Sequence, residues 1–258
     1  MRIVTATLLV ARQAMGQSAR GLRLVALSLL TFVPLMLTAL IVSVEETIQF
    51  STFAGITLFF SFQIIVPLLA LILGVSVLGD EIEGRTLTYL YTRPLPRPVY
   101  FIGRMLGLGC FFGILLAISL AGSAALFGSD LNFDARHIAS ATFIGLVAFG
   151  VYLAIFAAIR TILKPALYVG FLWIFVVEGI VSKIPNSGAP RSSVWHHVMV
   201  VFTDQFDEFL FPGKVRAMAD VGDPGQSMWM LAAIFAGAIA VAVIRLQTTE
   251  QRLPAAVA

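Results

Sequence analysis

Long uninterrupted apolar stretches alternate with short polar ones along the whole chain. An apolar helix needs about 20 residues to cross the ~30 Å hydrocarbon core of a bilayer. The stretches of about that length or more are residues 24–44, 53–79, 99–127, 138–159, 166–184 and 228–246. Their apolar residues are continuous and do not alternate with a period of two, which indicates helices and not the strands of a membrane barrel. The pattern predicts an all-α membrane protein: a single domain with six transmembrane helices.

Composition supports the membrane assignment. The 258 residues are 59% hydrophobic and 12% charged, whereas a soluble domain carries about 25% charged and about 45–50% apolar residues. The net charge is +3 and the basic residues are scattered, so nothing points to nucleic acid as a partner. Cys110 is the single cysteine, so it cannot form a disulfide within the chain.

Basic residues in the loops predict the orientation, because loops that stay in the cytoplasm are rich in Lys and Arg. Six spans would place both termini on one side, with twelve of the seventeen basic residues. That side holds Arg2, Arg12, Arg20, Arg23, Arg85, Arg93, Arg97, Arg104, Arg160, Lys164, Arg245 and Arg252. Both termini are therefore expected in the cytoplasm of a multi-pass protein of the cell membrane, and a bacterial inner membrane is the expected one.

Residues 1–22 are a candidate for an amphipathic helix that lies in the headgroup region. Ile3, Val4, Thr7, Leu8, Ala11, Met15 and Ala19 can share one face of such a helix. Arg12 and Arg20 lie off that face. The alternative is a frayed basic terminus, and the interfacial helix is the favoured interpretation.

The longest segment outside the apolar stretches covers residues 185–227. It opens with PNSGAPRSS, which is typical of a loop, and continues with apolar and aromatic residues among which acids are interspersed. This composition is too short and too polar for two further spans. Short half-helices that dip into the outer leaflet, shielded by protein, would fit. A helix that lies on the membrane surface fits equally well, and the sequence leaves both open.

The segment between the second and third predicted spans reads GDEIEGRTLTYLYTRPLPRPVY. A plain connection between two helices needs only about 2–8 residues. Prolines stop a helix here, and Pro98 suits the first turn of the next one. The segment also carries tyrosines and arginines, which are enriched at protein interfaces. A simple connecting loop is the alternative, but length and aromatic content favour a docking element for a protein partner.

This segment, continued through FIGRMLG, resembles the signature of the ABC type-2 permeases, the membrane subunits of ATP-driven exporters. The matching positions are Glu81, Glu83, Gly84, Thr86, Leu87, Arg93, Pro94, Arg97 and Tyr100. Some members of the family are linked to the maturation of multicopper enzymes. The resemblance implies that the segment is a coupling helix seated in a groove of a separate ATPase subunit. The residues expected at that contact are Asp80, Glu81, Glu83, Arg85, Thr86, Leu87, Tyr89, Leu90, Tyr91, Arg93 and Arg97.

The same resemblance implies the partners and cofactors. A permease carries no ATPase of its own, and the sequence has no phosphate-binding Gly-x-x-x-x-Gly-Lys-Ser/Thr motif. ATP and Mg²⁺ are therefore expected on a partner ATPase, present in two copies, with no cofactor bound by this chain. A second permease copy, identical or related, would complete the path. The spans offer few polar side chains, so an amphipathic or lipid-like substrate is favoured. A non-transporting membrane scaffold and an intramembrane enzyme are the alternatives, although no His-Glu-x-x-His or Gly-x-Ser-x-Gly motif occurs.

Some polar residues stand out for their position. Glu178 interrupts the fifth predicted span, and an acid within a membrane costs about 2.5–3.5 kcal/mol on insertion scales, which makes it a functional candidate by default. With Gln63 and Tyr152 it is a candidate for the substrate path or an outer gate; otherwise it reaches the outer interface or pairs with Lys183. His196 and His197 are weak candidates for a metal site, because imidazole suits copper and zinc. Neighbouring residues on a helix point in different directions, so a solvated interfacial pair is the favoured interpretation.

Small residues recur at four-residue spacing, which lets membrane helices approach closely. Gly103 and Gly107, and then Gly109 and Gly113, follow this spacing near the start of the third predicted span. Ala232, Ala236 and Ala240 follow it in the last span. Packing within the chain is the expected role, and contact between two copies is the alternative.

Overall fold

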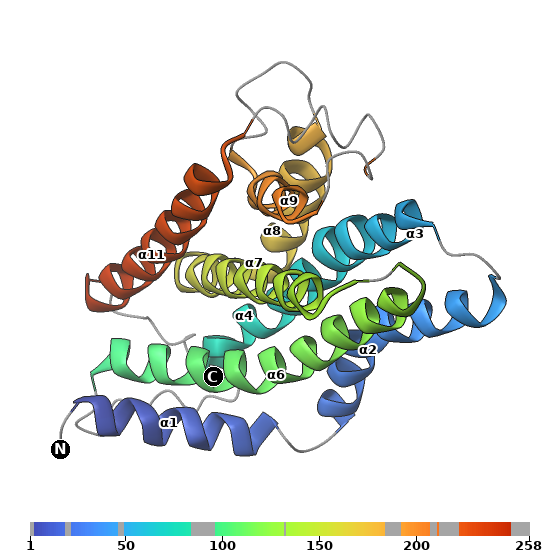
Figure 1. Cartoon of the computed structure of the whole chain (residues 1–258). Coiled ribbons are helices and arrows are strands. Elements are labelled where there is room, and N and C mark those ends of the chain that lie inside the picture. The colour runs from blue at the N-terminus through green and yellow to red at the C-terminus, as the bar shows by residue number, and fades with distance from the viewer. Residues whose placement is uncertain are drawn as a thin grey trace.

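A computed structural model describes residues 3–18, 22–45, 49–83, 96–131, 133–183, 192–206, 211 and 222–248, and these residues form helices without any strand (Figure 1). The α-helices are α1 (Ile3–Ser18), α2 (Leu22–Val44), α3 (Phe50–Ala54), α4 (Val66–Glu83), α6 (Arg97–Leu131), α7 (Ala135–Ile162), α8 (Ala166–Trp173), α9 (Val194–Asp204) and α11 (Pro224–Thr248). Two π-helices, η1 (Gly55–Ile65) and η2 (Ile174–Ile180), and the 3₁₀ turn η3 (Val181–Lys183) continue neighbouring α-helices without a break. The prediction of an all-helical fold is confirmed.

Five helices in the described part of the chain are long and apolar enough to cross a membrane. They cover Leu22–Val44, Phe50–Gly79, Arg97–Gly128, Ala135–Ile162 and Pro224–Thr248. The stretch predicted as the fifth span, residues 166–184, instead forms a shorter apolar helix, Ala166–Ile180, followed by η3. At 1.5 Å per residue the described helical run from Ala166 to Lys183 reaches about 27 Å, less than the ~30 Å of a bilayer core. The structure thus supports a multi-pass membrane protein with five spans of full length.

Helix α7 lies at the centre of the bundle and packs against α4, α6, α9 and α11. The contact between α4 and α7 is close because Gly74 has no side chain. A Cβ at Gly74 would lie 2.9 Å from both the Cβ of Phe156 and the backbone nitrogen of Ala157. Two thirds of the span in α7, and of the span formed by α3, η1 and α4, is buried inside the protein (67% each).

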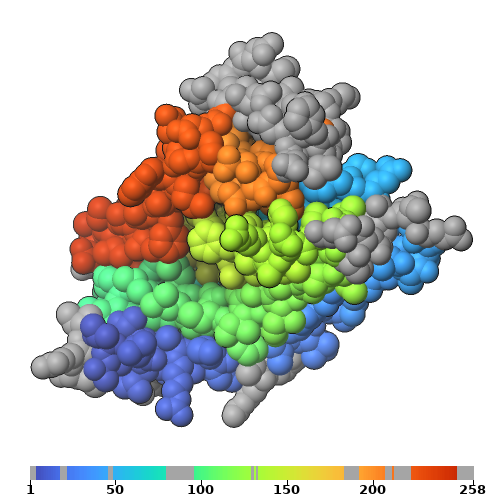
Figure 2. All heavy atoms as spheres, in the orientation of Figure 1, coloured from blue at the N-terminus to red at the C-terminus, as the bar shows by residue number. Residues whose placement is uncertain are grey.

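Helix α1 lies along the first half of α6 (Figure 2). Gly103 and Gly107 of α6 meet Thr7, Val10, Ala11 and Ala14 so closely that a Cβ would collide with α1. This confirms packing within the chain for the first glycine pair.

The face of α1 that packs against α6 consists of small side chains. Ala6, Val10 and Ala14 are buried, whereas Val4 and Leu8, on the predicted apolar face, are exposed. The glycine groove of α6 accepts small side chains, because a larger one would collide with its backbone. The exposed apolar side chains of α1 still suit a helix at a membrane interface.

The outer helices expose large apolar side chains. Met36 and Leu40 of α2, and Trp229 and Ile244 of α11, are each more than half exposed. Ala232, Ala236 and Ala240 are also exposed, so the expected packing of these alanines within the chain is wrong. Many exposed large apolar side chains on one helix are typical of a face that meets a membrane or a partner.

Candidate functional site

The side chain of Glu178, on η2, is completely buried and receives hydrogen bonds from the start of α9. The hydroxyl of Ser193 donates to Oε2 at 2.6 Å, and the backbone N–H of Trp195 donates to the same oxygen at 3.0 Å. The backbone N–H of Val194 donates to Oε1 at 3.2 Å. The prediction that this acid reaches the outer interface is wrong, and the side chain of Lys183, its other predicted partner, lies outside the described residues.

The carboxylate of Glu178 supplies hydrogen-bond acceptors for backbone N–H groups in the first turn of α9. The first N–H groups of any helix lack partners within that helix and carry a partial positive charge. Ser193 is the N-cap residue. Its hydroxyl oxygen accepts a hydrogen bond from the backbone N–H of His196 at 3.4 Å, and the same hydroxyl donates a hydrogen bond to Glu178. The carboxylate of Glu178 accepts from the first two N–H groups of the helix, those of Val194 and Trp195. Three donors thus compensate an acid that would otherwise be costly in an apolar interior.

Gln63 and Tyr152, predicted together with Glu178, lie beside it. The side-chain amide of Gln63, on η1, donates to the backbone carbonyl of Glu178 at 3.0 Å. The hydroxyl of Ser182 donates to the same carbonyl. Tyr152 of α7 is fully buried, and its phenol faces the carboxylate of Glu178 and the backbone of Trp195. The phenol hydroxyl makes no hydrogen bond of ordinary geometry with the described residues.

Trp195 ties the same site to η1. Its indole N–H donates to the backbone carbonyl of Leu58 at 3.4 Å. The carboxylate, the amide, the phenol and the indole therefore meet where four elements converge: η1, η2, α7 and α9. We refer to Gln63, Tyr152, Glu178, Ser193 and Trp195 as the polar node. Ser193 and Trp195 were not among the predicted site residues, although a serine just before an apolar helical stretch is a recognisable N-cap signal.

Helix α9 is buried on all sides. Every residue from Val194 to Thr203 is buried, and the helix packs against η1, α7 and α11. Helix α9 is thus an interior helix of the bundle, and its position relative to a membrane, inserted or on the surface, stays a prediction. Beyond the polar node, α9 ends in a cluster of phenylalanines whose neighbouring ring centroids lie between 4.8 and 6.4 Å apart. The cluster comprises Phe50, Phe53, Phe133, Phe202, Phe206 and Phe211.

His196 and His197 are both buried on α9, so the prediction of a solvated pair is wrong. Their rings lie 5.5 Å apart, and Nδ1 of His197 is 3.2 Å from the hydroxyl oxygen of Ser227 on α11. No group of three or more His, Cys, Asp or Glu side chains that could hold a metal is found in the part of the chain that the structure describes. The geometry assigns His197 to the contact between α9 and α11.

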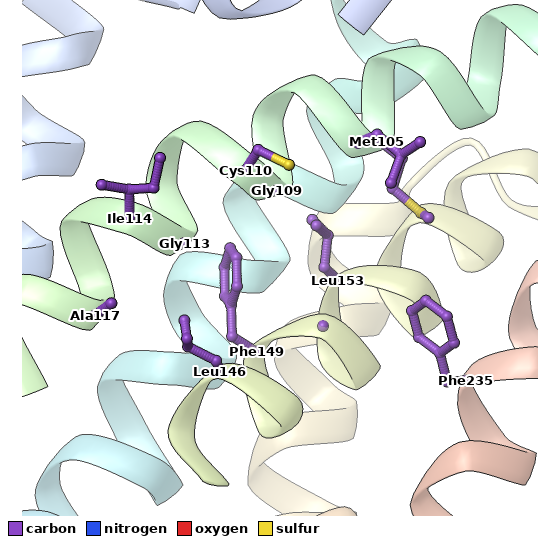
Figure 3. Close-up of a pocket in the computed structure, with 12 residues that line it drawn as sticks. Met105, Gly109, Cys110, Gly113, Ile114, Ala117, Leu146, Phe149, Leu153 and Phe235 are labelled. Atoms are coloured by element: carbon purple, nitrogen blue, oxygen red, sulfur yellow. The ribbon is translucent and has the colours of Figure 1, made fainter. Parts of the chain in front are cut away.

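An apolar groove of about 430 Å³ opens between α6, α7 and α11 (Figure 3). Gly109 and Gly113, the second predicted glycine pair, form its α6 wall, and Leu146, Phe149 and Leu153 of α7 face them. The other lining residues are Met105, Leu106, Cys110, Ile114, Ala117, Gly150 and Phe235. The groove could therefore bind an apolar group by van der Waals contact, without strong hydrogen bonds from its side chains.

Most of the predicted ATPase-coupling segment lies outside the described residues. Helix α4 continues beyond Gly79 through Asp80, Glu81 and Glu83, and Arg97 opens α6. The side chains of Asp80, Glu81 and Glu83 are not described. Arg85, Thr86, Leu87, Tyr89, Leu90, Tyr91 and Arg93 belong to residues 84–95, which the structure does not describe.

Comparison of the chain with models of known protein families gives no match, and comparison with curated proteins gives none either.

Proposed function

We propose that the chain is the membrane-spanning permease subunit of an ABC exporter. A separate ATPase subunit, in two copies, would hydrolyse ATP, and a second permease copy would complete the path. The observation that carries the proposal is the signature between residues 79 and 107, together with the extension of α4 beyond the apolar stretch. Helix α4 ends at Glu83, so the helix itself continues into the segment that resembles a coupling helix.

The same helix leads to the polar node. From Phe50 to Glu83 the chain is helical without interruption through α3, η1 and α4. Gln63, which contacts Glu178, and Leu58, which contacts Trp195, both lie on this continuous helix, which we call the helical rod. Gln63 and Glu83 are separated by about 30 Å at 1.5 Å per residue. A displacement imposed on the Glu83 end would therefore reach the node through one packed helix, which is a physical route for coupling.

The surfaces available to a substrate favour an amphipathic or lipid-like molecule. The groove between α6, α7 and α11 is lined by apolar residues, and the polar node is occupied by its own hydrogen bonds. In the node it is Gln63, Glu178, Ser193 and Trp195 that are held by these hydrogen bonds, and Tyr152 is fully buried. Such surfaces cannot replace the hydration of a strongly charged solute, whose transfer from water would be costly.

The ATPase contact can be tested by purification of the tagged chain from its native membrane. An ATPase should co-purify with the wild-type chain. In the double variant Tyr89→Ala with Leu90→Ala, the ATPase yield should fall at least about tenfold, a loss of ~1.4 kcal/mol, because tyrosines are among the interface residues whose truncation costs most. Membrane insertion of the variant should be unchanged.

Leu167→Ala with Tyr168→Ala is a matched control, because it removes an adjacent and exposed leucine–tyrosine pair on α8. This control should keep the wild-type ATPase yield. Absence of any ATPase from the wild-type preparation, or an undiminished yield with the Tyr89 and Leu90 variant, would refute the proposed contact.

A further inference from the structure

The polar anchorage of α9 is concentrated at one end. At its N-terminus the helix directs the Ser193 hydroxyl and two backbone N–H groups to the carboxylate of Glu178. At its C-terminus Asp204 and Gln205 are exposed, and Gln205 accepts an exposed hydrogen bond of 3.3 Å from the hydroxyl of the half-buried Ser140. A buried charge-assisted bond is stronger than an exposed neutral one. Among the described residues, Glu178 therefore provides the charged attachment of α9, beside the hydrogen bonds of Trp195 to Leu58 and of His197 to Ser227.

No acceptor within α9 can replace the carboxylate of Glu178 as the hydrogen-bond partner of the first N–H groups. The N–H groups of Val194 and Trp195 belong to the first turn, where no intrahelical acceptor exists. Away from water, a donor that loses its acceptor is costly to keep buried. Withdrawal of the carboxylate would therefore favour movement of this end of α9 out of its apolar surroundings.

The elements that hold Glu178 and Gln63 are both π-helices. A π-helix closes its hydrogen bonds over five residues instead of four, and such turns often mark functional positions. Conversion of one turn of η2 to α geometry would rotate the residues that follow around the helix axis. Glu178 lies inside η2, so a change of this kind would turn its carboxylate away from Ser193 and Trp195.

We propose that Glu178 is a latch that holds α9 inside the protein, and that α9 is a gate whose N-terminal end is released when the carboxylate withdraws. The gating role rests on the proposed permease function, whereas the latch itself does not. Helix α9 contacts η1, α7 and α11, so its release would open a route into the bundle beside the helical rod that ends at Glu83.

Cysteine accessibility provides the test, because Cys110 is the single cysteine of the chain. In a Cys110→Ala background, Val198→Cys places a thiol on α9, and Ala148→Cys places one on the central helix α7; both native residues are buried. Maleimide labelling is measured on the purified chain in lipid vesicles. Glu178→Gln, which keeps the size but removes the charge, and Glu178→Ala should each accelerate labelling at position 198 at least about tenfold. Labelling at position 148 should stay within about twofold.

Asp204→Asn is the matched control, because it removes an exposed acid from the other end of the same helix. It should leave labelling at both positions unchanged. If Glu178→Ala is not recovered from the membrane, the isosteric Glu178→Gln decides the question. Wild-type labelling at position 198 in the glutamine variant overturns the latch, and so does an equal acceleration at positions 148 and 198, which would show general loosening.

This experiment needs no ATPase, so its failure is distinguishable from failure of the proposed function. Accelerated labelling together with the absence of a co-purifying ATPase would leave the latch in place and remove the permease assignment. A co-purifying ATPase together with unchanged labelling would support the permease assignment and overturn the latch.

Discussion

Helices α9 and α11 pack against each other, yet they distribute polar and apolar residues in opposite ways. Helix α9 is short and carries Ser193 at its cap and two histidines, and it is buried from Val194 to Thr203. Helix α11 is long and apolar, but only 17% of its span is buried. In a water-soluble protein the apolar helix would be inside. The inversion is expected where lipid is the solvent, because polar groups must then find partners within the protein while apolar side chains can remain outside.

The largest expected difference between the two helices concerns phenylalanine. Phe202 of α9 is fully buried, whereas Phe235 of α11 is about one third exposed. Phe202→Ala should destabilise the protein by about 3–5 kcal/mol, because a cavity remains inside the aromatic cluster. Phe235→Ala should cost less than about 1 kcal/mol, because lipid can fill the space. Unfolding in mixed micelles measures both values, and equal losses would contradict the assignment of α9 to the interior.

Glycine provides the next contrast between the core and the periphery. Gly74→Ala should cost about 1–3 kcal/mol, because its Cβ would force α4 away from Phe156 and Ala157. At Gly237 of α11, by contrast, an added Cβ would have no neighbouring atom within 4 Å. Gly237→Ala should therefore gain up to about 1 kcal/mol from helix propensity. The same unfolding assay measures both changes in free energy. An unchanged free energy of unfolding for Gly74→Ala would show that α4 and α7 are less closely packed than described.

The hydrogen bond between α9 and α11 should have a smaller effect. Ser227→Ala removes the partner of His197 and should cost about 1 kcal/mol, the usual net contribution of one hydrogen bond. A double-mutant cycle with His197→Ala isolates the interaction. A coupling energy close to zero would show that the two side chains do not stabilise each other.

The smallest effect is expected on the outer face of α11. Ala236 is exposed, so Ala236→Leu should change the free energy of unfolding by no more than about 0.5 kcal/mol. A loss well above that value in a preparation of associated copies, absent from dilute single chains, would show that this face contacts a second copy.

Hydropathy predicted the all-helical fold of the described residues and, among them, five helices long enough to cross a membrane, because the bilayer imposes a length on every apolar stretch. It did not predict that residues 166–184 form a shorter helix. It also identified Gln63, Tyr152 and Glu178, since polar residues are conspicuous within apolar runs. Each of these inferences depends only on the residues in one stretch.

Tertiary structure decided which of these residues meet. Glu178 bonds to Ser193 and Trp195, which lie 15 and 17 positions further along the chain, and no local pattern specifies that contact. The buried face of α1 depends on the glycines of α6, and the burial of His197 depends on α11. Hydropathy describes one helix against its solvent, whereas the choice of partners for a buried polar group depends on how all the helices share the interior.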